Sequence, residues 1–396
     1  MELLTKVDVF APPENSYKVL HYITEMIAEA LVEQGVKTRL FDSRIASDPM
    51  KFTGMVLADR PDCTLSIDGL LPDSQGNFLC DILGIPHVAI LHKTPQNFFQ
   101  MVKSPYTIMC CADQFYVRFL KLFGDTHVLF LPNAADGKIV LPTPSERPYD
   151  VVMFASYLNY EEVRQLWIEK YSSDLCQVLD ESADLTLSRP QISYIEALCE
   201  CMKVPVAQGR IDPRSVNYQE VFNDLEDYIR ALDKLKILHA IEGVDVHVYG
   251  EGDWSGFASR AKTRIIPHDS VPFIEAIEVM KQTKIVLNST PQLKYGGHER
   301  FYTAYMCGAL PITAQTPFIE QDYVTNEDAL YYQPQRWGDI NDVIHFALGN
   351  PAKRNEIMER GRHITHEKNT WKARIQTLMD ELPPILDSLK EAPNDK

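Results

Sequence analysis

The feature that most constrains this fold is a repeated alternation of short apolar runs with amphipathic segments. The chain opens with "KVDVFAP", continues with "SYKVLHYITEMIAEALVEQG", whose apolar residues have helical spacing and end at Gly35, and then reads "VKTRLFD". This order is typical of a β-α-β unit. Further apolar runs, "CTLSID", "PHVAIL", "YTIMCCA" and "HVLFLP", repeat the pattern. Short apolar strands are typical of parallel sheets covered on both faces. We therefore predict a doubly wound, Rossmann-like α/β domain over about residues 1–140.

A second α/β domain is predicted over residues 141–370. The proline-rich stretch "NAADGKIVLPTPSERPYD" is typical of an interdomain linker. Strand-like runs then follow in "YDVVMFASY", "VDVHVYG", "TRIIPH", "KIVLNS", "ALPITA" and "ALYYQ". A helical insert is predicted over about residues 160–240. Two domains also suit a chain of 396 residues, which is long for one core.

The last segment, residues 371–396, contains the helical pattern "WKARIQTLMDELPPIL". Proline lacks a backbone N–H and clashes with the preceding turn, so Pro383–Pro384 predicts a kink or an end of this helix.

Composition excludes several classes of function. The formal net charge of −16 argues against nucleic-acid binding and against a basic membrane-surface patch. The start "MELLTKVDVF" lacks the features of a signal peptide, and no window approaches 18 apolar residues, so we expect a cytoplasmic protein without an integral membrane segment. The eight cysteines sit mostly in apolar runs without paired C-x-x-C spacing, which favours buried thiols over a metal site.

The stretch "LKYGGHERFYTAYMCGALPI", residues 293–312, places charged residues at the ligand-binding edge of the second sheet. Ligands bind beyond the carboxyl ends of parallel strands. The preceding strand ends near Leu287 and Asn288, so the loop 289–297 and a helix from about His298 lie at that edge. Gly296 and Gly297 permit positive φ and close backbone approach. The helix N-terminus then predicts an anion site.

Arg300 and Lys294 would add full charges beside these amides, which suits a diphosphate. Glu299 can only accept hydrogen bonds, so its expected partners are sugar or ribose hydroxyls. The competing interpretation is a solvated helix start, where Glu299 serves the helix dipole and Arg300 makes a surface ion pair of about 1 kcal/mol or less.

The segment "NSTPQLKYGGHERFYTAYMCGALPIT" resembles the donor-binding segment of GT-B glycosyltransferases, and more closely the CgeB-type (spore maturation protein-like) family. The segments "YDVVMFAS", "VHVYGEGDW" and "IIPHDSVPFIEAIEVMKQTKIVLN" fit the same family. The resemblance implies two Rossmann-like domains facing across a cleft, with a nucleotide-diphosphate-sugar donor held by the second and the acceptor approached from the first. It also implies a last helix that packs back toward the first domain. No metal or other cofactor is expected, because cationic side chains and helix amides stabilise the leaving diphosphate.

The resemblance also suggests donor contacts in other loops. Many retaining GT-B enzymes carry a ribose-binding glutamate at the position of Thr303. Three alternatives follow for this chain: Glu299 binds the ribose instead, the contact with the ribose is weaker, or donor binding is lost. Gly250, His268 and Ser156 lie in loops that approach the donor in the family. A tight turn would equally explain Gly250, and a solvated loop residue would explain His268.

An inverting enzyme would need a general base from the first domain. His92, which follows "PHVAIL", is the main candidate, with Asp68 and Asp113 as others. A retaining mechanism needs no such base, so the stereochemistry stays open.

The function expected from the sequence is metal-independent transfer of a sugar, with a UDP-sugar as the expected donor, to a glycan, protein or metabolite. A non-catalytic nucleotide-sugar-binding or partner-docking protein of the same fold is the alternative. A sugar-nucleotide epimerase would need acid and base groups around the sugar, and no such cluster is evident. The helical insert is either an interaction module or a cover for the sheet.

Overall fold

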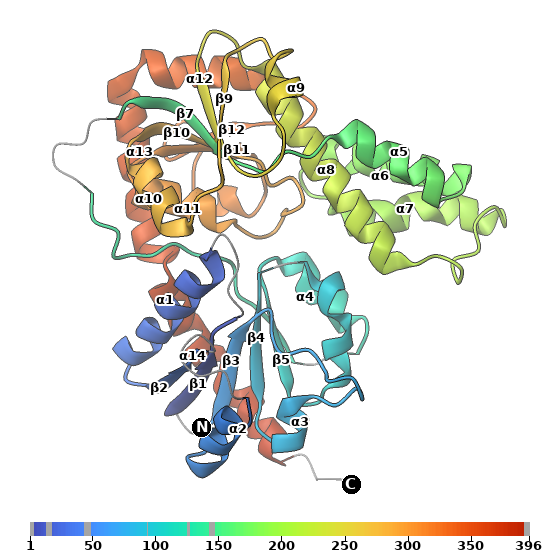
Figure 1. The fold of residues 1–396 in the computed structure, drawn as a ribbon, viewed down its shortest axis with the longest axis vertical. Helices are drawn as coiled ribbons and strands as arrows, with labels where there is room; N and C mark the ends of the chain where they lie inside the picture. The colour runs from blue at the N-terminus through green and yellow to red at the C-terminus, as the bar shows by residue number, and fades with distance from the viewer. Residues whose placement is uncertain are drawn as a thin grey trace. The chain divides into compact units, whose positions relative to one another are not determined.

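The computed structural model describes residues 4–12, 18–42, 49–92, 94–124, 127–141 and 147–391. The chain divides into two compact units. Unit 1 comprises Met1–Gly137, Pro272–Ile274 and Glu367–Lys396, and unit 2 comprises Lys138–Val271 and Glu275–His366. Each unit is built around its own parallel six-stranded sheet (Figure 1). The predicted fold class, two Rossmann-like α/β units with separate sheets, is confirmed.

The sheet of unit 1 has the strand order β2-β1-β3-β4-β5-β6, with every neighbouring pair parallel. Its strands are β1 (Lys6–Phe10), β2 (Lys37–Phe41), β3 (Cys63–Ile67), β4 (His87–Leu91), β5 (Thr107–Cys111) and β6 (Val128–Phe130). The connecting helices are α1 (Val19–Glu33), α2 (Pro49–Ala58), α3 (Leu79–Leu83), the 3-10 helix η1 (Pro95–Lys103) and α4 (Gln114–Lys121). Every residue of β3, β4 and β5 is buried, which is why their sequences are apolar runs.

The C-terminal helix α14 (Trp371–Glu391) belongs to unit 1. Its residues Leu378, Leu382 and Leu386 are buried in one core cluster with residues of α1 and of the sheet. The helix continues through Pro383 and Pro384, so it does not end there. Each buried leucine contributes about 1.5–3 kcal/mol. Three of them together are comparable to the cost of two interior prolines, at about 3 kcal/mol each. Residues 392–396 of the predicted C-terminal segment lie outside the described residues.

The sheet of unit 2 has the strand order β12-β11-β10-β7-β8-β9, again parallel throughout. Its strands are β7 (Tyr149–Phe154), β8 (Val246–Tyr249), β9 (Ile265–His268), β10 (Thr283–Asn288), β11 (Leu310–Ala314) and β12 (Leu330–Tyr332). The loops after β7, β8, β9 and β10 therefore gather at one edge. Helices α9 (Ser255–Ala258), α10 (Phe273–Lys281), α11 (Glu299–Met306), η2 (Ile319–Gln321), α12 (Asp339–Gly349) and α13 (Pro351–Lys368) complete the connections. Part of the predicted linker, residues 142–146, lies outside the described residues.

The predicted insert is helical and consists of α5 (Tyr160–Lys170), α6 (Ser173–Ser188), α7 (Tyr194–Ala207) and α8 (Tyr218–Ala240). The side chains of Asn159, Ser172, Ser193 and Asn217 each accept a hydrogen bond from a backbone N–H in the first turn of the helix that follows. Such caps satisfy donors that a helix leaves unpaired. Figure 1 shows α5, α6 and α7 beside the long helix α8, whose C-terminal end leads into β8.

Within the described ranges, no helix is both long enough and apolar enough to cross a membrane. The cysteines are mostly buried, as predicted: Cys63, Cys80, Cys110, Cys111 and Cys307 are buried, whereas Cys199 on α7 is exposed.

Candidate functional site

The helix α11 begins at the predicted place, directly after the loop that follows β10. His298 is its N-cap, and His298 Nδ1 accepts a hydrogen bond from the Arg300 N–H at 3.2 Å. The same nitrogen lies 2.6 Å from Glu299 Oε2, so the other tautomer donates to that carboxylate. Glu299 is buried in the first turn, and the Arg300 side chain is partly exposed. The positive end of α11 is thus at the ligand-binding edge of unit 2.

The glycine pair before α11 is explained in part by packing. A Cβ on Gly297 would lie 1.9 Å from the hydroxyl oxygen of Tyr302, so only glycine leaves room for this ring. Gly297 does not adopt the left-handed conformation that the sequence suggested, and Gly296 is buried. Close backbone approach, rather than positive φ, is what Gly297 provides.

Lys294 has a protein partner. Its side chain is buried, and Nζ donates to the carbonyl oxygen of Thr186 on α6 at 2.9 Å. This contact ties the loop before α11 to the helical insert. A contact between Lys294 and a diphosphate remains a prediction.

Two cations that sequence reasoning did not identify, Arg230 and Lys234, interact electrostatically with Arg300. Arg230 and Lys234 are one helical turn apart on α8, and therefore on the same face. The Lys234 ammonium donates to the carbonyl oxygen of Ser156, in the loop after β7, at 2.6 Å. We call Arg230, Lys234 and Arg300 the cation cluster.

The charges of the cation cluster act on one another. The pKa of Lys234 is lowered to about 7, chiefly by burial and then by the positive charges of Arg230 and Arg300, with Asp227 opposing. Burial also lowers the pKa of Arg300; Glu299 opposes this effect and Arg230 adds to it. Among the described residues, Lys234 and Arg300 form no ion pair with a carboxylate, and the one ion pair of Arg230, with Glu226, is long at 3.8 Å. Three mutually repelling cations at a strand edge are the arrangement that a polyanion would stabilise.

A buried carboxylate holds this face of α8 against the sheet. Asp233 accepts hydrogen bonds from Ser289 Oγ at 2.7 Å, Tyr332 Oη at 2.5 Å and Trp337 Nε1 at 2.7 Å. Ser289 follows β10 and Tyr332 ends β12. Burial raises the pKa of Asp233, while these three hydrogen bonds oppose the shift. Asp233 therefore fixes the helix that carries Arg230 and Lys234 relative to the strand ends.

Gly250 and Ser156 meet each other at the strand edge. A Cβ on Gly250 would lie 2.1 Å from the carbonyl oxygen of Ala155, so the glycine is required by the neighbouring backbone. Ser156 is exposed, and its hydroxyl oxygen accepts from the Glu251 N–H at 3.3 Å. Ser156 thus reaches the cation cluster through its carbonyl group.

His268 ends β9 within a stack of rings. It lies parallel to Tyr249, with ring centroids 4.3 Å apart, and its Nε2 is 2.8 Å from His247 Nδ1. Burial lowers the pKa of His268, with Asp269 opposing. These contacts give the imidazole protein partners, and its contact with a nucleobase remains a prediction.

Asn288 and Thr303 are both buried in unit 2. The Asn288 amide donates to Thr313 Oγ1 at 3.0 Å and to Thr290 Oγ1 at 3.3 Å. Asn288 therefore links the ends of β10 and β11, and Thr303 lies in the interior of α11.

The candidate bases of unit 1 have local hydrogen-bonding roles. The backbone N–H of His92 donates to Asp68 Oδ1 at 2.8 Å. This hydrogen bond joins the residue that follows β4 to the residue that follows β3. Asp113 is the N-cap of α4 and accepts from the Phe115 N–H at 2.7 Å. A catalytic role for His92 remains a prediction.

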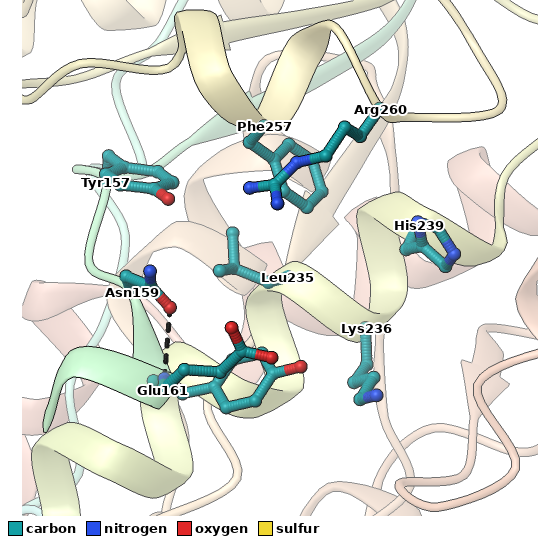
Figure 2. Close-up of a pocket in the computed structure, with 9 residues that line it drawn as sticks. Tyr157, Asn159, Glu161, Leu235, Lys236, His239, Phe257 and Arg260 are labelled. Atoms are coloured by element: carbon teal, nitrogen blue, oxygen red, sulfur yellow. Dashed lines mark hydrogen bonds between the residues drawn. The ribbon is translucent and has the colours of Figure 1, made fainter. Parts of the chain in front are cut away.

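A pocket of about 230 Å³ lies against α8, lined in part by Leu235, Lys236 and His239 (Figure 2). At 100° per residue, Leu235, Lys236 and His239 project away from the face that carries Arg230 and Lys234. The remaining lining residues are Tyr157, Asn159, Tyr160, Glu161, Phe257 and Arg260. Because it opens on the opposite face, this pocket is distinct from the cation cluster.

Comparison of the whole chain with solved structures decides the fold. The structure is similar to HepE of Anabaena in complex with UDP-glucose, with a TM-score of 0.52, 11% identity, and coverage of 96% of this chain and 99% of HepE. It is also similar to AviGT4, a glycosyltransferase involved in avilamycin A biosynthesis, with a TM-score of 0.55, 11% identity, and coverage of 97% and 98%. The chain has the GT-B fold. An α-glucosyltransferase in complex with UDP-glucose and DNA containing an abasic site shares this GT-B architecture at a TM-score of 0.54 and 9% identity, with coverage of 96% and 98%.

Sequence comparison supports the assignment of the second GT-B unit. Residues 228–380 match a family described as "Glycosyl transferase-like". The match begins just before Arg230, so it includes the cation cluster and leaves out α5, α6 and α7. The chain is also 20% identical to an uncharacterized protein of Aquifex aeolicus, with 94% of each chain covered.

Proposed function

We propose that this GT-B protein is a glycosyltransferase that moves a sugar from a nucleotide-diphosphate sugar, a UDP-sugar in the first instance, to an acceptor. The single observation that carries the proposal is the cation cluster: Lys234 donates to the carbonyl oxygen of Ser156 at the carboxyl edge of the unit 2 sheet, and Arg300, whose charge acts on it, lies in the first turn of α11. The solved complexes of HepE and of the α-glucosyltransferase contain UDP-glucose, which supports a uridine donor. The resemblance of the "HER" segment to CgeB-type enzymes supports the same assignment.

In the proposed reaction the bond between the sugar's anomeric carbon and the diphosphate oxygen breaks. A new bond forms to an acceptor oxygen, which loses its proton, and UDP leaves. Negative charge develops on the diphosphate as this bond breaks. Arg300, Arg230 and Lys234, together with the first N–H groups of α11, would stabilise that charge without a metal. Glu299 is available for hydroxyls of the ribose or the sugar.

A glycan, a protein or a metabolite fits the proposal as the acceptor. A non-catalytic nucleotide-sugar-binding protein of the same fold is the second candidate. Thr303 favours it, because this buried threonine stands where many retaining relatives carry the ribose-binding glutamate.

The test combines binding with turnover. UDP binding to the wild-type chain is measured by calorimetry, and UDP release from UDP-glucose is measured with and without candidate acceptors. We expect binding that Arg230→Ala and Lys234→Met both weaken, whereas Lys236→Met, on the opposite face of α8, leaves it unchanged. Binding without UDP release from any sugar donor would favour the non-catalytic candidate, and equal UDP affinity in all variants would remove the cation cluster from the site.

A further inference from the structure

The pocket against α8, which we call the α8 pocket, has walls of aromatic side chains (Figure 2). Tyr157 lies in the loop after β7, Tyr160 begins α5, and Phe257 lies on α9. The buried Trp254 packs edge-on against the rings of Tyr157 and Phe257, with ring centroids 5.2 Å and 6.0 Å away. The buried side chain of Leu235 supplies an apolar surface between these walls.

The walls of the α8 pocket are held in place by contacts within the protein. The Tyr157 N–H donates to the carbonyl oxygen of Glu251 at 2.7 Å. Gly252 has a φ of +94°, and a Cβ there would lie 2.9 Å from Tyr157 Cβ, so glycine lets the loop after β8 close on Tyr157. On the other wall, the Lys236 ammonium lies 5.6 Å from the ring centroid of Tyr160. A ligand would therefore meet rings that are already positioned.

Two opposite charges face the α8 pocket without pairing. Figure 2 shows the Arg260 guanidinium, which follows α9, and the Glu161 carboxylate, on α5, directed toward the space beside Leu235. Arg260 Nε donates to the carbonyl oxygen of Gly256 at 3.0 Å, which leaves its two terminal nitrogens for other acceptors. Within the described ranges, neither Arg260 nor Glu161 forms an ion pair, and the Glu161 carboxylate accepts no hydrogen bond.

The Tyr157 hydroxyl lies within electrostatic reach of both charged groups. Burial raises the pKa of Tyr157, the charges of Glu162, Asp253 and Glu161 raise it further, and the charge of Arg260 opposes them. Glu162 and Asp253 do not line the pocket. A hydrogen-bond donor, an acceptor and a hydroxyl that can do both therefore face one apolar space.

We propose that the α8 pocket binds one neutral sugar unit. A sugar hydroxyl accepts a hydrogen bond from Arg260 and donates one to Glu161, whereas a phosphate would be repelled by Glu161 and a cation by Arg260. The aromatic walls suit the apolar C–H faces of a sugar ring, and a few placed polar groups set its orientation. The volume of about 230 Å³ is below the range of about 300–1,000 Å³ that is typical of pockets for drug-sized ligands, which favours a single sugar over a nucleotide sugar.

The proposed sugar site is separate from the proposed donor site, because no member of the cation cluster lines the α8 pocket. A sugar bound there is not the sugar that is transferred. Within the proposed function, the α8 pocket would hold a unit of a glycan acceptor, and this refinement rests on that function. Sugar binding itself does not rest on it.

Saturation-transfer NMR with the full chain and no nucleotide tests the proposal. The probes are methyl α-glucoside, methyl β-galactoside and N-acetylglucosamine. We expect saturable binding of at least one probe with a Kd of about a millimolar, since a ligand of this size makes few contacts. Arg260→Ala and Glu161→Ala should each weaken binding at least about fivefold. Arg264→Ala and Glu169→Ala, which change exposed residues of the same kinds outside the pocket, are the matched controls and should bind like the wild type.

Three results would overturn the proposal. The first is the absence of saturable binding of all three probes to the wild type. The second is an equal loss of binding in the pocket variants and in their matched controls. The third is displacement of the bound sugar by UDP, which would place it in the donor site. Sugar binding that persists in a chain that does not bind UDP would support this proposal and count against the proposed function alone. Melting curves of all variants show whether each remains folded.

Discussion

At the scale of single residues, Arg300 distinguishes a donor site from a solvated helix start. If its guanidinium contacts the diphosphate, Arg300→Ala should cost about 2–4 kcal/mol of transition-state stabilisation, roughly a hundredfold in rate. Arg300→Lys should recover only part of this loss, since it keeps the charge without the planar fork. The melting temperature should not fall, because Arg300→Ala also removes the repulsion between Arg300 and the other members of the cation cluster. Equal UDP affinity in wild type and Arg300→Ala would refute its role in the donor site.

Lys234 predicts a pH dependence of donor binding. With a pKa of about 7, its ammonium is only about half protonated in the free protein at neutral pH. A bound diphosphate would raise this pKa, so binding takes up a proton. Affinity should therefore be constant below about pH 6 and fall as the pH rises through 7, by up to about tenfold per unit.

Calorimetry with UDP-glucose measures this dependence, because its diphosphate diester has no proton to lose in the range. Lys234→Met should bind more weakly and without the slope, whereas Lys236→Met should keep it. A slope that survives in Lys234→Met would assign the titration to another group.

At the scale of elements, Asp233 is the contact that holds α8 on the strand edge. Asp233→Asn replaces an acceptor of three hydrogen bonds with an amide that faces the same donors. We expect a loss of about 1–3 kcal/mol in the free energy of unfolding, together with a severalfold rise in the KM for the donor. The rise in KM should be smaller when Asp233→Asn is made in an Arg230→Ala background. Asp233 is proposed to act by positioning Arg230, so the effects of the two substitutions on the KM should not add. A purely structural role would lower stability and leave the KM unchanged in both backgrounds.

At the scale of the whole molecule, each unit has its own sheet and core, so nucleotide should stabilise unit 2 more than unit 1. A ligand at about 100 times its Kd adds about 2.7 kcal/mol to the state that binds it. Hydrogen exchange with saturating UDP should therefore slow in β7, β10 and α8, and change little in the strands of unit 1. Equal protection of both units would contradict a site confined to unit 2.

Metal removal tests the proposed metal-independent mechanism. Because cationic side chains and helix amides are proposed to meet the diphosphate, EDTA should leave donor turnover nearly unchanged. Within the described ranges, no group of three His, Cys, Asp or Glu side chains is arranged to hold a metal ion. Activity that EDTA abolishes and manganese restores would reject the metal-independent mechanism.

The sequence by itself determined the order of strands and helices, the two sheets, the helical insert and the start of α11 after β10. These features follow from local periodicity and from burial on both faces of a parallel strand, which are written in consecutive residues. Only the tertiary structure decided which cations meet. Lys294, near the "GGHER" motif, donates to the carbonyl oxygen of Thr186. The charges that act on one another are instead those of Arg300, Arg230 and Lys234. Lys234 also donates to the carbonyl oxygen of Ser156, from which it is separated in the sequence by the helical insert. Proximity across 78 residues depends on how α8 packs against the sheet through Asp233, and no local pattern encodes that packing. The spacing R-x-x-x-K before β8 was the one available signal, and it is common on exposed helices.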